Sequence, residues 1–240
     1  MSDAGPAPGT LYLVPVSLGS DDPRLVLPPS TLAIARDLEV FAVENPKTAR
    51  DFLKRIGHPR PMRELAIHTL DKRTGDREVK ALGALLTAGR PCGLLSEAGC
   101  PAVADPGSAL VRLAHGAGVP VVPLVGPSSI LLALMASGMD GQHFAFHGYL
   151  PVEAGARARR IRQIEIQASQ ATQIFIETPY RNDRLMAALA RVCEPATLLC
   201  VATDLTLASE SVRTAAIAEW RRAPSAIGKR PTVFLLLASA

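Results

Sequence analysis

The chain lacks the patterns that mark membrane, exported and metal-scaffold proteins. Over its 240 residues no apolar run reaches the roughly 18 residues that a membrane-spanning helix requires. The first residues, MSDAGPAPGT, do not show the basic segment followed by an apolar segment that is typical of a signal peptide. The four cysteines include no C-x-x-C pair, which favours reduced thiols over a zinc site or a disulfide framework. These absences predict a cytoplasmic protein with no membrane segment and no bound metal.

The chain also lacks a dense basic stripe. Its 26 lysines and arginines are nearly balanced by 22 acidic residues, so the formal net charge is only +4. A dedicated nucleic-acid module usually gathers basic residues on one face, so this composition allows RNA binding without requiring it. Arginines cluster between Arg157 and Arg162, but Glu153 and Glu165 interleave with them, which favours a solvated helix face over a phosphate-binding surface.

Neither G-x-G-x-x-G nor G-x-x-x-x-G-K-[ST] occurs, so the phosphate cradles of dinucleotide-binding and P-loop proteins are missing. The chain has instead two loops rich in proline and glycine, SEAGCPAVADPG (96–107) and VGPSS (125–129). Each follows a short apolar run and precedes a helical pattern, as loops at the carboxyl ends of parallel strands do. We expect a small-molecule site there. S-adenosylmethionine, which carries no phosphate, fits loops whose glycines let main-chain groups approach a ligand closely.

Hydrophobic periodicity predicts two α/β domains, 1–122 and 123–240. In the first, strands alternate with helices, which predicts a parallel-rich sheet, with strands at 10–16, 40–43, 64–69, 92–95 and 121–125 and helices at 32–38, 47–56 and 77–88. The second is predicted to have a mixed sheet, with strands at 144–146, 173–177, 197–203 and 232–238 and helices at 130–137, 153–168, 182–192 and 215–222. The first ten residues are expected to form a loose tail.

Five segments, in this order and spacing, resemble the tetrapyrrole methylase superfamily: GTLYLVPVSLG (9–19), SEAGCPAVADPG, VGPSS, HGYLP (147–151) and IETPYR (176–181). The resemblance is greatest to the branch that methylates the 2′-hydroxyl of a cytidine ribose in small-subunit ribosomal RNA, whose signature is S-D-A-G-T-P-x-x-S-D-P-G. It implies two α/β domains with S-adenosylmethionine in a cleft between them. It also implies methyltransferase activity on ribosomal RNA or the small ribosomal subunit, and a homodimer.

The resemblance further implies a set of cofactor-binding residues from three loops and from the second domain: Pro15, Leu18, Glu97, Gly99, Cys100, Ser128, Ser129, Tyr149 and Ala202. Glu97 stands where the family usually has aspartate. The extra methylene of glutamate shifts the carboxylate, which changes the geometry of a hydrogen bond without abolishing it. Cys100 replaces a threonine and loses a good donor. From the residues alone, Glu97 also fits a surface carboxylate, and the two serines equally fit a simple helix cap.

Several departures fall on the substrate side of that resemblance. The chain reads VENPK (43–47) where the branch has a run like A-E-D-T-R, keeps only His68 of an H-E-H-N-like segment, and has Leu207 at a position where lysine is usual. It also ends at Ala240, before the small helical extension of longer members. We therefore expect a shortened, divergent member. Two alternatives stay open: methylation of a small molecule such as a tetrapyrrole, and a non-catalytic paralogue that binds S-adenosylmethionine without turnover.

Methyl transfer to a ribose requires the enzyme to activate the hydroxyl, because a neutral hydroxyl is a poor nucleophile. A carboxylate or a cation can stabilise the developing alkoxide, and Glu177 and Arg181 in IETPYR are the catalytic candidates. An ion pair that only orders the loop explains the same two residues about equally well. His143 and His147 lie four apart, but in a strand-like run, which argues against a metal site on a helix.

Overall fold

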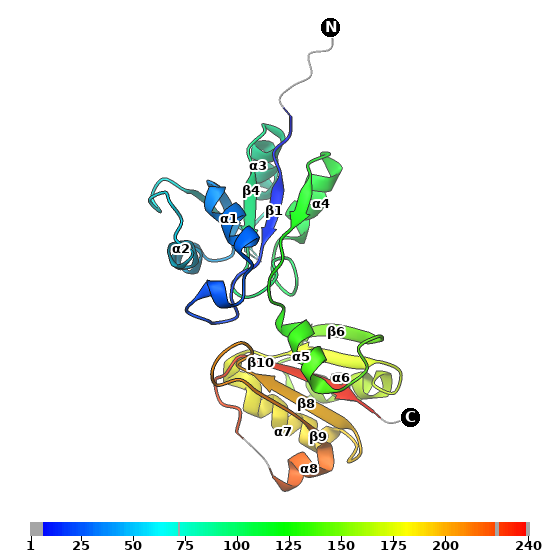
Figure 1. The fold of residues 1–240 in the computed structure, drawn as a ribbon. Coiled ribbons are helices and arrows are strands. Elements are labelled where there is room, and N and C mark those ends of the chain that lie inside the picture. Colours follow the sequence, from blue (N-terminus) through cyan, green and yellow to red (C-terminus); the bar gives the residue numbers. More distant parts are fainter. Residues whose placement is uncertain (1–6, 72, 224–225, 239–240) are drawn as a thin grey trace. The chain divides into compact units, whose positions relative to one another are not determined.

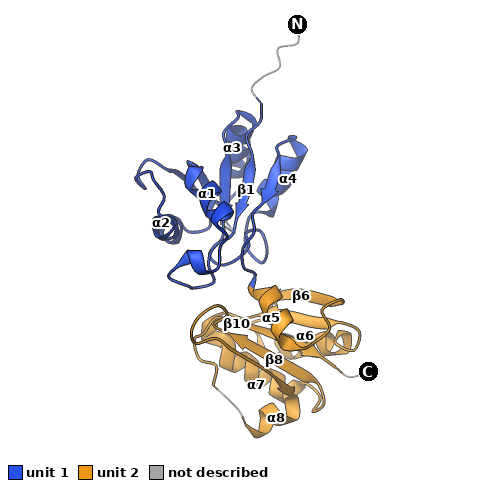
Figure 2. Ribbon diagram, viewed as in Figure 1, with its two compact units in different colours: residues 1–128 blue, residues 129–240 orange. Residues whose placement is uncertain are grey.

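The chain consists of two compact units, residues 1–128 and 129–240 (Figure 2). The computed structural model describes residues 7–71, 73–223 and 226–238. Each unit is built on its own five-stranded sheet. The domain boundary that the sequence predicts, between residues 122 and 123, stays a prediction.

The sheet of the first unit is wholly parallel, with the strand order β3-β2-β4-β1-β5. Figure 1 labels β1 and β4, two adjacent strands of this sheet. Its strands are β1 (Leu11–Val14), β2 (Val40–Val43), β3 (Ala66–Thr69), β4 (Cys92–Leu95) and β5 (Val121–Pro123). Parallel neighbours need a crossover connection, and the first four strands are followed by α1 (Pro29–Asp37), α2 (Pro46–Arg55), α3 (Asp76–Thr87) and α4 (Ser108–Gly116). The carboxyl ends of β4, β1 and β5 therefore lie side by side at one edge.

Helices cover both faces of this sheet. On β2, Phe41 and Val43 pack into the cluster that contains α1 and α2, whereas Val40 and Ala42 pack into the cluster that contains α3 and α4. A strand buried on both faces has apolar residues at every position. This explains why short, uninterrupted apolar runs such as VFAV and CGLL mark the strands in the sequence.

The sheet of the second unit is mixed, with the order β6-β7-β10-β8-β9. Its strands are β6 (Phe144–Tyr149), β7 (Thr172–Ile176), β8 (Leu198–Thr203), β9 (Ser211–Ala216) and β10 (Thr232–Leu237). β6 and β7 pair in parallel, and the other neighbours are antiparallel. One face packs against α5 (Ser129–Ser137), and the other packs against α6 (Ala154–Gln167), α7 (Asn182–Val192) and α8 (Ile217–Arg222). The predicted fold class, one parallel and one mixed α/β sheet, is confirmed.

Two local predictions are wrong. β9 was not expected, because as an edge strand with polar Ser211, Arg213 and Thr214 it has no apolar run. Its last residues, Ala215 and Ala216, were assigned to the following helix, which begins only at residue 217.

The expected tail is also shorter than ten residues. Gly9 is buried, and its amide donates to the Leu86 carbonyl at 2.7 Å. Residues 1–6 of that predicted tail lie outside the described residues. No helix within the described ranges is both long and apolar enough to cross a membrane.

Candidate functional site

Three loops meet at the carboxyl edge of the first unit's sheet. The Val16 amide, after β1, donates to the Gly99 carbonyl, after β4, at 2.9 Å. The Cys100 thiol donates a weak hydrogen bond to the Pro127 carbonyl, after β5, over 3.4 Å. The Thr31 hydroxyl of α1 also donates to the Val125 carbonyl at 2.8 Å. Loops that are far apart in the sequence thus form one continuous surface.

Close backbone approach explains the glycines in these loops. A Cβ atom on Gly126 would lie 2.3 Å from the Pro15 Cβ, a distance that no packed pair of carbons adopts. Gly99 has a φ of +68°, and a Cβ there would lie 3.1 Å from the Leu18 Cδ2 and 3.2 Å from the Pro127 carbonyl oxygen. The structure therefore brings together Pro15, Leu18, Gly99 and its neighbour Cys100, four of the five cofactor-binding residues predicted in the first two loops. The fifth, Glu97, lines the pocket described below.

The loop after β4 is held in a strained conformation. Ala102 and Ala104 have φ angles of 63° and 65°, in the left-handed region that alanine rarely adopts. Such conformations cost about 1–3 kcal/mol each and concentrate at ligand-binding loops. At the end of the loop Gly107 has a φ of 135°, and a Cβ there would lie 2.6 Å from the Leu94 Cδ2. The loop is thus held in this conformation by its packing against β4.

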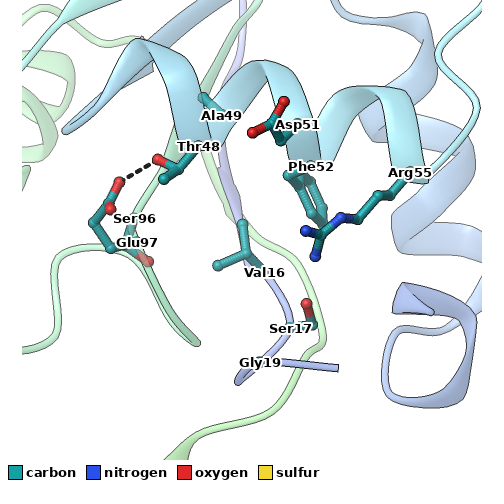
Figure 3. Close-up of a pocket in the computed structure, with 10 residues that line it drawn as sticks. All are labelled: Val16, Ser17, Gly19, Thr48, Ala49, Asp51, Phe52, Arg55, Ser96 and Glu97. Carbon is teal, nitrogen blue, oxygen red and sulfur yellow. Dashed lines mark hydrogen bonds between the residues drawn. The ribbon is translucent and has the colours of Figure 1, made fainter. Parts of the chain in front are cut away.

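A pocket of about 180 Å³ opens beside these loops in the first unit (Figure 3). It is lined by residues after β1, residues after β4 and one side of α2: Val16, Ser17, Gly19, Ser96, Glu97, Thr48, Ala49, Asp51, Phe52 and Arg55. The Thr48 hydroxyl donates to Glu97 Oε1 at 2.6 Å, and in Figure 3 this pair and the Arg55 guanidinium lie at opposite ends of the group. The pocket lining thus contains hydroxyls, two carboxylates and a guanidinium.

The VENPK segment builds the start of α2, which lines this pocket. Asn45 caps the helix by accepting a hydrogen bond from the Lys47 amide at 2.9 Å, and Pro46 occupies the first turn, where its fixed φ suits a helix. The cap places Thr48 against Glu97. The sequence predicts the helix at 47–56 but does not single out Thr48, Asp51 and Arg55 on it as pocket residues. The Asn-Pro pair before a helical pattern was the available signal.

The remaining predicted cofactor residues are spread over several elements. Ser128 ends the first unit, Ser129 begins α5, and both are partly buried. Tyr149 ends β6 with 49% of its surface exposed. Ala202 is buried in β8, in a cluster with residues of α5, and β7 and β10 lie between its strand and β6. Within the second unit, therefore, Tyr149 and Ala202 are not neighbours.

Glu177 and Arg181 form an ion pair directly after β7. The Arg181 guanidinium donates to Glu177 Oε1, which also accepts the Thr178 amide at 2.7 Å. Arg181 Nε reaches the Thr178 hydroxyl at 3.1 Å. Glu177 is only 5% exposed, and its second oxygen, Oε2, has no hydrogen-bond partner among the described residues. A buried acceptor without a donor is unfavourable unless a ligand or water completes it.

A second strained turn follows β8, whose carboxyl end lies at the same edge of the sheet as that of β7. Asp204 and Thr206 have φ angles of 52° and 73°. Asp204 Oδ2 accepts the Ser209 hydroxyl at 3.0 Å and lies 3.6 Å from the Arg230 guanidinium. Leu207, the position where the related branch has lysine, lies in this turn and donates its amide to the Asp204 carbonyl. Sequence reasoning singled out only Leu207, because strained non-glycine residues carry no sequence mark.

The two histidines of HFAFHG have separate polar partners. His143 lies 3.2 Å from the Asp140 carboxylate. His147 Nδ1 lies 3.0 Å from an Arg160 nitrogen, and because a guanidinium only donates, Nδ1 accepts and Nε2 donates to the Gln173 carbonyl oxygen at 2.6 Å. In the part of the chain that the structure describes, no three His, Cys, Asp or Glu side chains are placed to share a metal ion.

A parallel sheet with glycine-containing loops at its carboxyl edge, followed in the chain by a mixed α/β unit, places the protein among the two-unit α/β proteins, a class in which small ligands commonly bind at strand ends. The family model described as Tetrapyrrole (Corrin/Porphyrin) Methylases matches residues 10–220. The chain belongs to this family, which confirms the resemblance, and it is a methyltransferase that uses S-adenosylmethionine.

Named relatives and solved structures agree with this assignment. The chain is 33% identical over 205 residues to "Ribosomal RNA small subunit methyltransferase I" of Xylella fastidiosa strain Temecula1, covering 85% of this chain and 71% of that protein. It is 35% identical over 211 residues to the protein of the same name in Mesorhizobium japonicum, covering 88% and 68%.

Two crystal structures share the fold. The methyltransferase CobJ has a TM-score of 0.64 at 19% identity, covering 97% of this chain and 95% of that one. Uroporphyrin-III C-methyl transferase from Thermus thermophilus, complexed with S-adenosylhomocysteine, has a TM-score of 0.58 at 19% identity, covering 95% and 97%.

Proposed function

We propose that this protein methylates the 2′-hydroxyl of a ribose in small-subunit ribosomal RNA. The observation that carries the proposal is the similarity, over 85–88% of the chain, to proteins named for small-subunit ribosomal RNA methylation. The strained loop after β4 and the glycines packed against Pro15 and Leu18 supply a fixed ligand surface at the expected sheet edge.

The loops of the first unit suit the cofactor chemically. Because Gly126 and Gly99 carry no side chain, the three loops can pack closely against Pro15, Leu18 and Pro127, and such close packing would hold main-chain groups in fixed positions for an adenosine and an amino-acid tail. We assign to the cofactor site of the first unit Pro15, Leu18, Glu97, Gly99, Cys100 and Ser128. For Ser129, Tyr149 and Ala202 of the second unit, cofactor binding stays a prediction of the family resemblance. The pocket of about 180 Å³ has room for part of such a ligand, since whole ligand pockets are typically about 300–1,000 Å³.

Cys100 offers a direct chemical probe of this assignment. Burial raises the pKa of Cys92 and of Cys193 to about 12 and also raises the pKa of Cys200 and of Cys100. Of the four thiols, however, only that of Cys100 is partly exposed, and the other three are buried. The thiolate is the reactive form. We therefore expect iodoacetamide to label Cys100 first, slowly at neutral pH and faster as the pH rises, and saturating S-adenosylmethionine to slow this labelling at least about tenfold.

Peptide mass mapping of the alkylated protein measures this protection. The Cys100→Ser variant is the control, because it removes the fast site and leaves the three buried thiols. Equal labelling rates at Cys100 with and without the cofactor would exclude it from the site.

Catalysis is assigned to the ion pair after β7. When bound, S-adenosylmethionine would supply a methyl group activated on a sulfonium, whose carbon–sulfur bond breaks to release the neutral thioether S-adenosylhomocysteine. Glu177 Oε2, which has no partner in the described part of the chain, accepts the proton of the ribose hydroxyl as the new oxygen–carbon bond forms. Arg181 and the Thr178 amide hold Oε1, so the carboxylate is oriented before the hydroxyl arrives.

Methyl transfer from tritium-labelled S-adenosylmethionine tests the function. Small ribosomal subunits from a strain that lacks this gene are the acceptor, and the RNA is then digested to nucleosides. We expect label in a 2′-O-methylated nucleoside. Label in a tetrapyrrole but not in RNA would establish a small-molecule methylase instead, and cofactor binding without any transfer would establish a non-catalytic paralogue.

The proposal includes a homodimer, on the strength of the family resemblance, and a cytoplasmic site of action, because small ribosomal subunits are found there. Light scattering on the purified chain tests the first part. A mass twice the 25.4 kDa of one chain is expected, and a mass equal to one chain would refute the dimer.

A further inference from the structure

We propose that a pocket between α6 and α7 binds a phosphodiester group of the RNA substrate; this inference rests on the proposed function. The pocket has a volume of about 380 Å³. Three arginines line it, Arg157 from α6 and Arg184 and Arg191 from α7, and the rest of the lining is alanine and one valine. No acidic residue lines the pocket among the described residues.

Arg157 is the buried member of this group. It is only 5% exposed, its Nη1 donates to the Val152 carbonyl at 2.9 Å, and its Nε has no partner among the described residues. The nearest acid on its own helix, Glu153, is occupied as the helix cap, with its oxygens on the amides of Gly155 and Ala156. Arg157 is near enough to Glu153 for its charge to help lower the pKa of that carboxyl, but its buried Nε has no acceptor among the described residues. An anion in the pocket would supply that acceptor.

The two arginines of α7 complete the positive charge. Arg184 and Arg191 are seven residues apart, which places them two turns apart on one face of the helix. Both are exposed, and neither forms an ion pair with a carboxylate in the described part of the chain. The small side chains of Ala187 and Ala188 between them leave the pocket open.

Guanidinium groups bind phosphate oxygens through paired, charge-assisted hydrogen bonds. Under the proposed function, the anion that this protein meets repeatedly is the phosphodiester of an RNA chain. The sequence favoured a solvated face for the 157–162 cluster, and for Arg157 that expectation is wrong. The cluster divides instead, because Arg157 lines the pocket while Arg160 contacts His147.

Salt-dependent RNA binding tests the pocket. Filter binding of labelled small-subunit ribosomal RNA to the full-length protein is measured over a series of KCl concentrations. The test variant is Arg184→Gln/Arg191→Gln, which leaves the buried Arg157 in place. The control is Arg162→Gln/Arg222→Gln, which removes the same charge from exposed arginines of this unit outside the pocket. Calorimetric titration with S-adenosylmethionine verifies that each variant is folded.

For the test variant we expect RNA binding about tenfold weaker at low salt and a slope of log K against log[KCl] that is smaller by about one, the loss of one phosphate contact. The control should change the slope by less than half as much. If the wild-type protein binds RNA and the two variants have equal slopes, the proposal that this pocket binds RNA is refuted. The proposed function is not affected by that result. A wild-type protein that binds the cofactor but not RNA would instead overturn the function itself. If calorimetry shows that inorganic phosphate binds the wild-type protein but not the test variant, while the RNA slopes do not differ, the pocket binds an anion other than RNA and the RNA assignment is refuted.

Discussion

Replacing Gly126 by valine is expected to lower the affinity for S-adenosylmethionine by about 100-fold. The first added carbon would lie 2.3 Å from Pro15 Cβ, 2.6 Å from Pro15 Cγ and 3.0 Å from Leu27 Cδ2. Neither proline atom is the end of a flexible side chain, so the loops after β1 and β5 must separate. Because the proposed site is formed where these loops meet, the main-chain groups that face the cofactor would move with them. Isothermal titration calorimetry measures the change.

Gly116→Ala is the matched control for this substitution. A Cβ at Gly116, the last residue of α4, has no atom within 4 Å, and the backbone there is helical. The control should bind the cofactor with wild-type affinity and gain up to about 0.5 kcal/mol in the free energy of unfolding. Wild-type affinity in the folded Gly126→Val protein would show that this loop does not contact the cofactor.

Replacing Glu177 by glutamine is expected to lower kcat for methyl transfer roughly 100-fold, while the Kd for S-adenosylmethionine changes less than about twofold. The amide keeps the size of the carboxylate and can still accept the Thr178 amide hydrogen bond. It cannot take up the proton of the ribose hydroxyl at the position of Oε2. Single-turnover methyl transfer separates this loss from changes in substrate binding.

A purely structural ion pair predicts a different outcome. Arg181→Lys would then lower the unfolding midpoint about as much as Glu177→Gln does, and neither variant would change kcat. Glu219→Gln is the matched control, because Glu219 is an exposed carboxylate on α8 and should be neutral in both measurements. Full turnover by Glu177→Gln would remove Glu177 from the catalytic residues.

The sequence predicts strands that are buried on both faces better than it predicts an edge strand, and burial explains the difference. β2 and β4 are buried on both faces, so every residue in them is apolar and their bounds, 40–43 and 92–95, are predicted correctly. β9 lies at an edge, where polar residues are tolerated, and no run marks it. The glycine-rich loops can be recognised in the sequence for a similar reason. Only glycine at residue 126 permits the close approach of Pro15, so the packing requires a specific residue type.

Contacts between residues that are far apart in the chain leave no comparable pattern in the sequence. The Thr48–Glu97 hydrogen bond joins residues 49 apart, and the pocket of Arg157, Arg184 and Arg191 needs the packing of α6 on α7. Charge interleaving along one helix describes only that helix, so it could not predict that Arg157 faces inward. The strain at Ala102 and Ala104 is also imposed by the fold, since alanine has no preference for positive φ.

Hydrogen exchange followed by mass spectrometry, with and without S-adenosylhomocysteine, tests most directly whether the three loops of the first unit form the cofactor site. Peptides that cover residues 15–19, 96–100 and 124–128 should all exchange more slowly with the ligand bound, while α3 should be unaffected. Protection confined to other segments, or protection of only one of the three loops, would contradict the site described here.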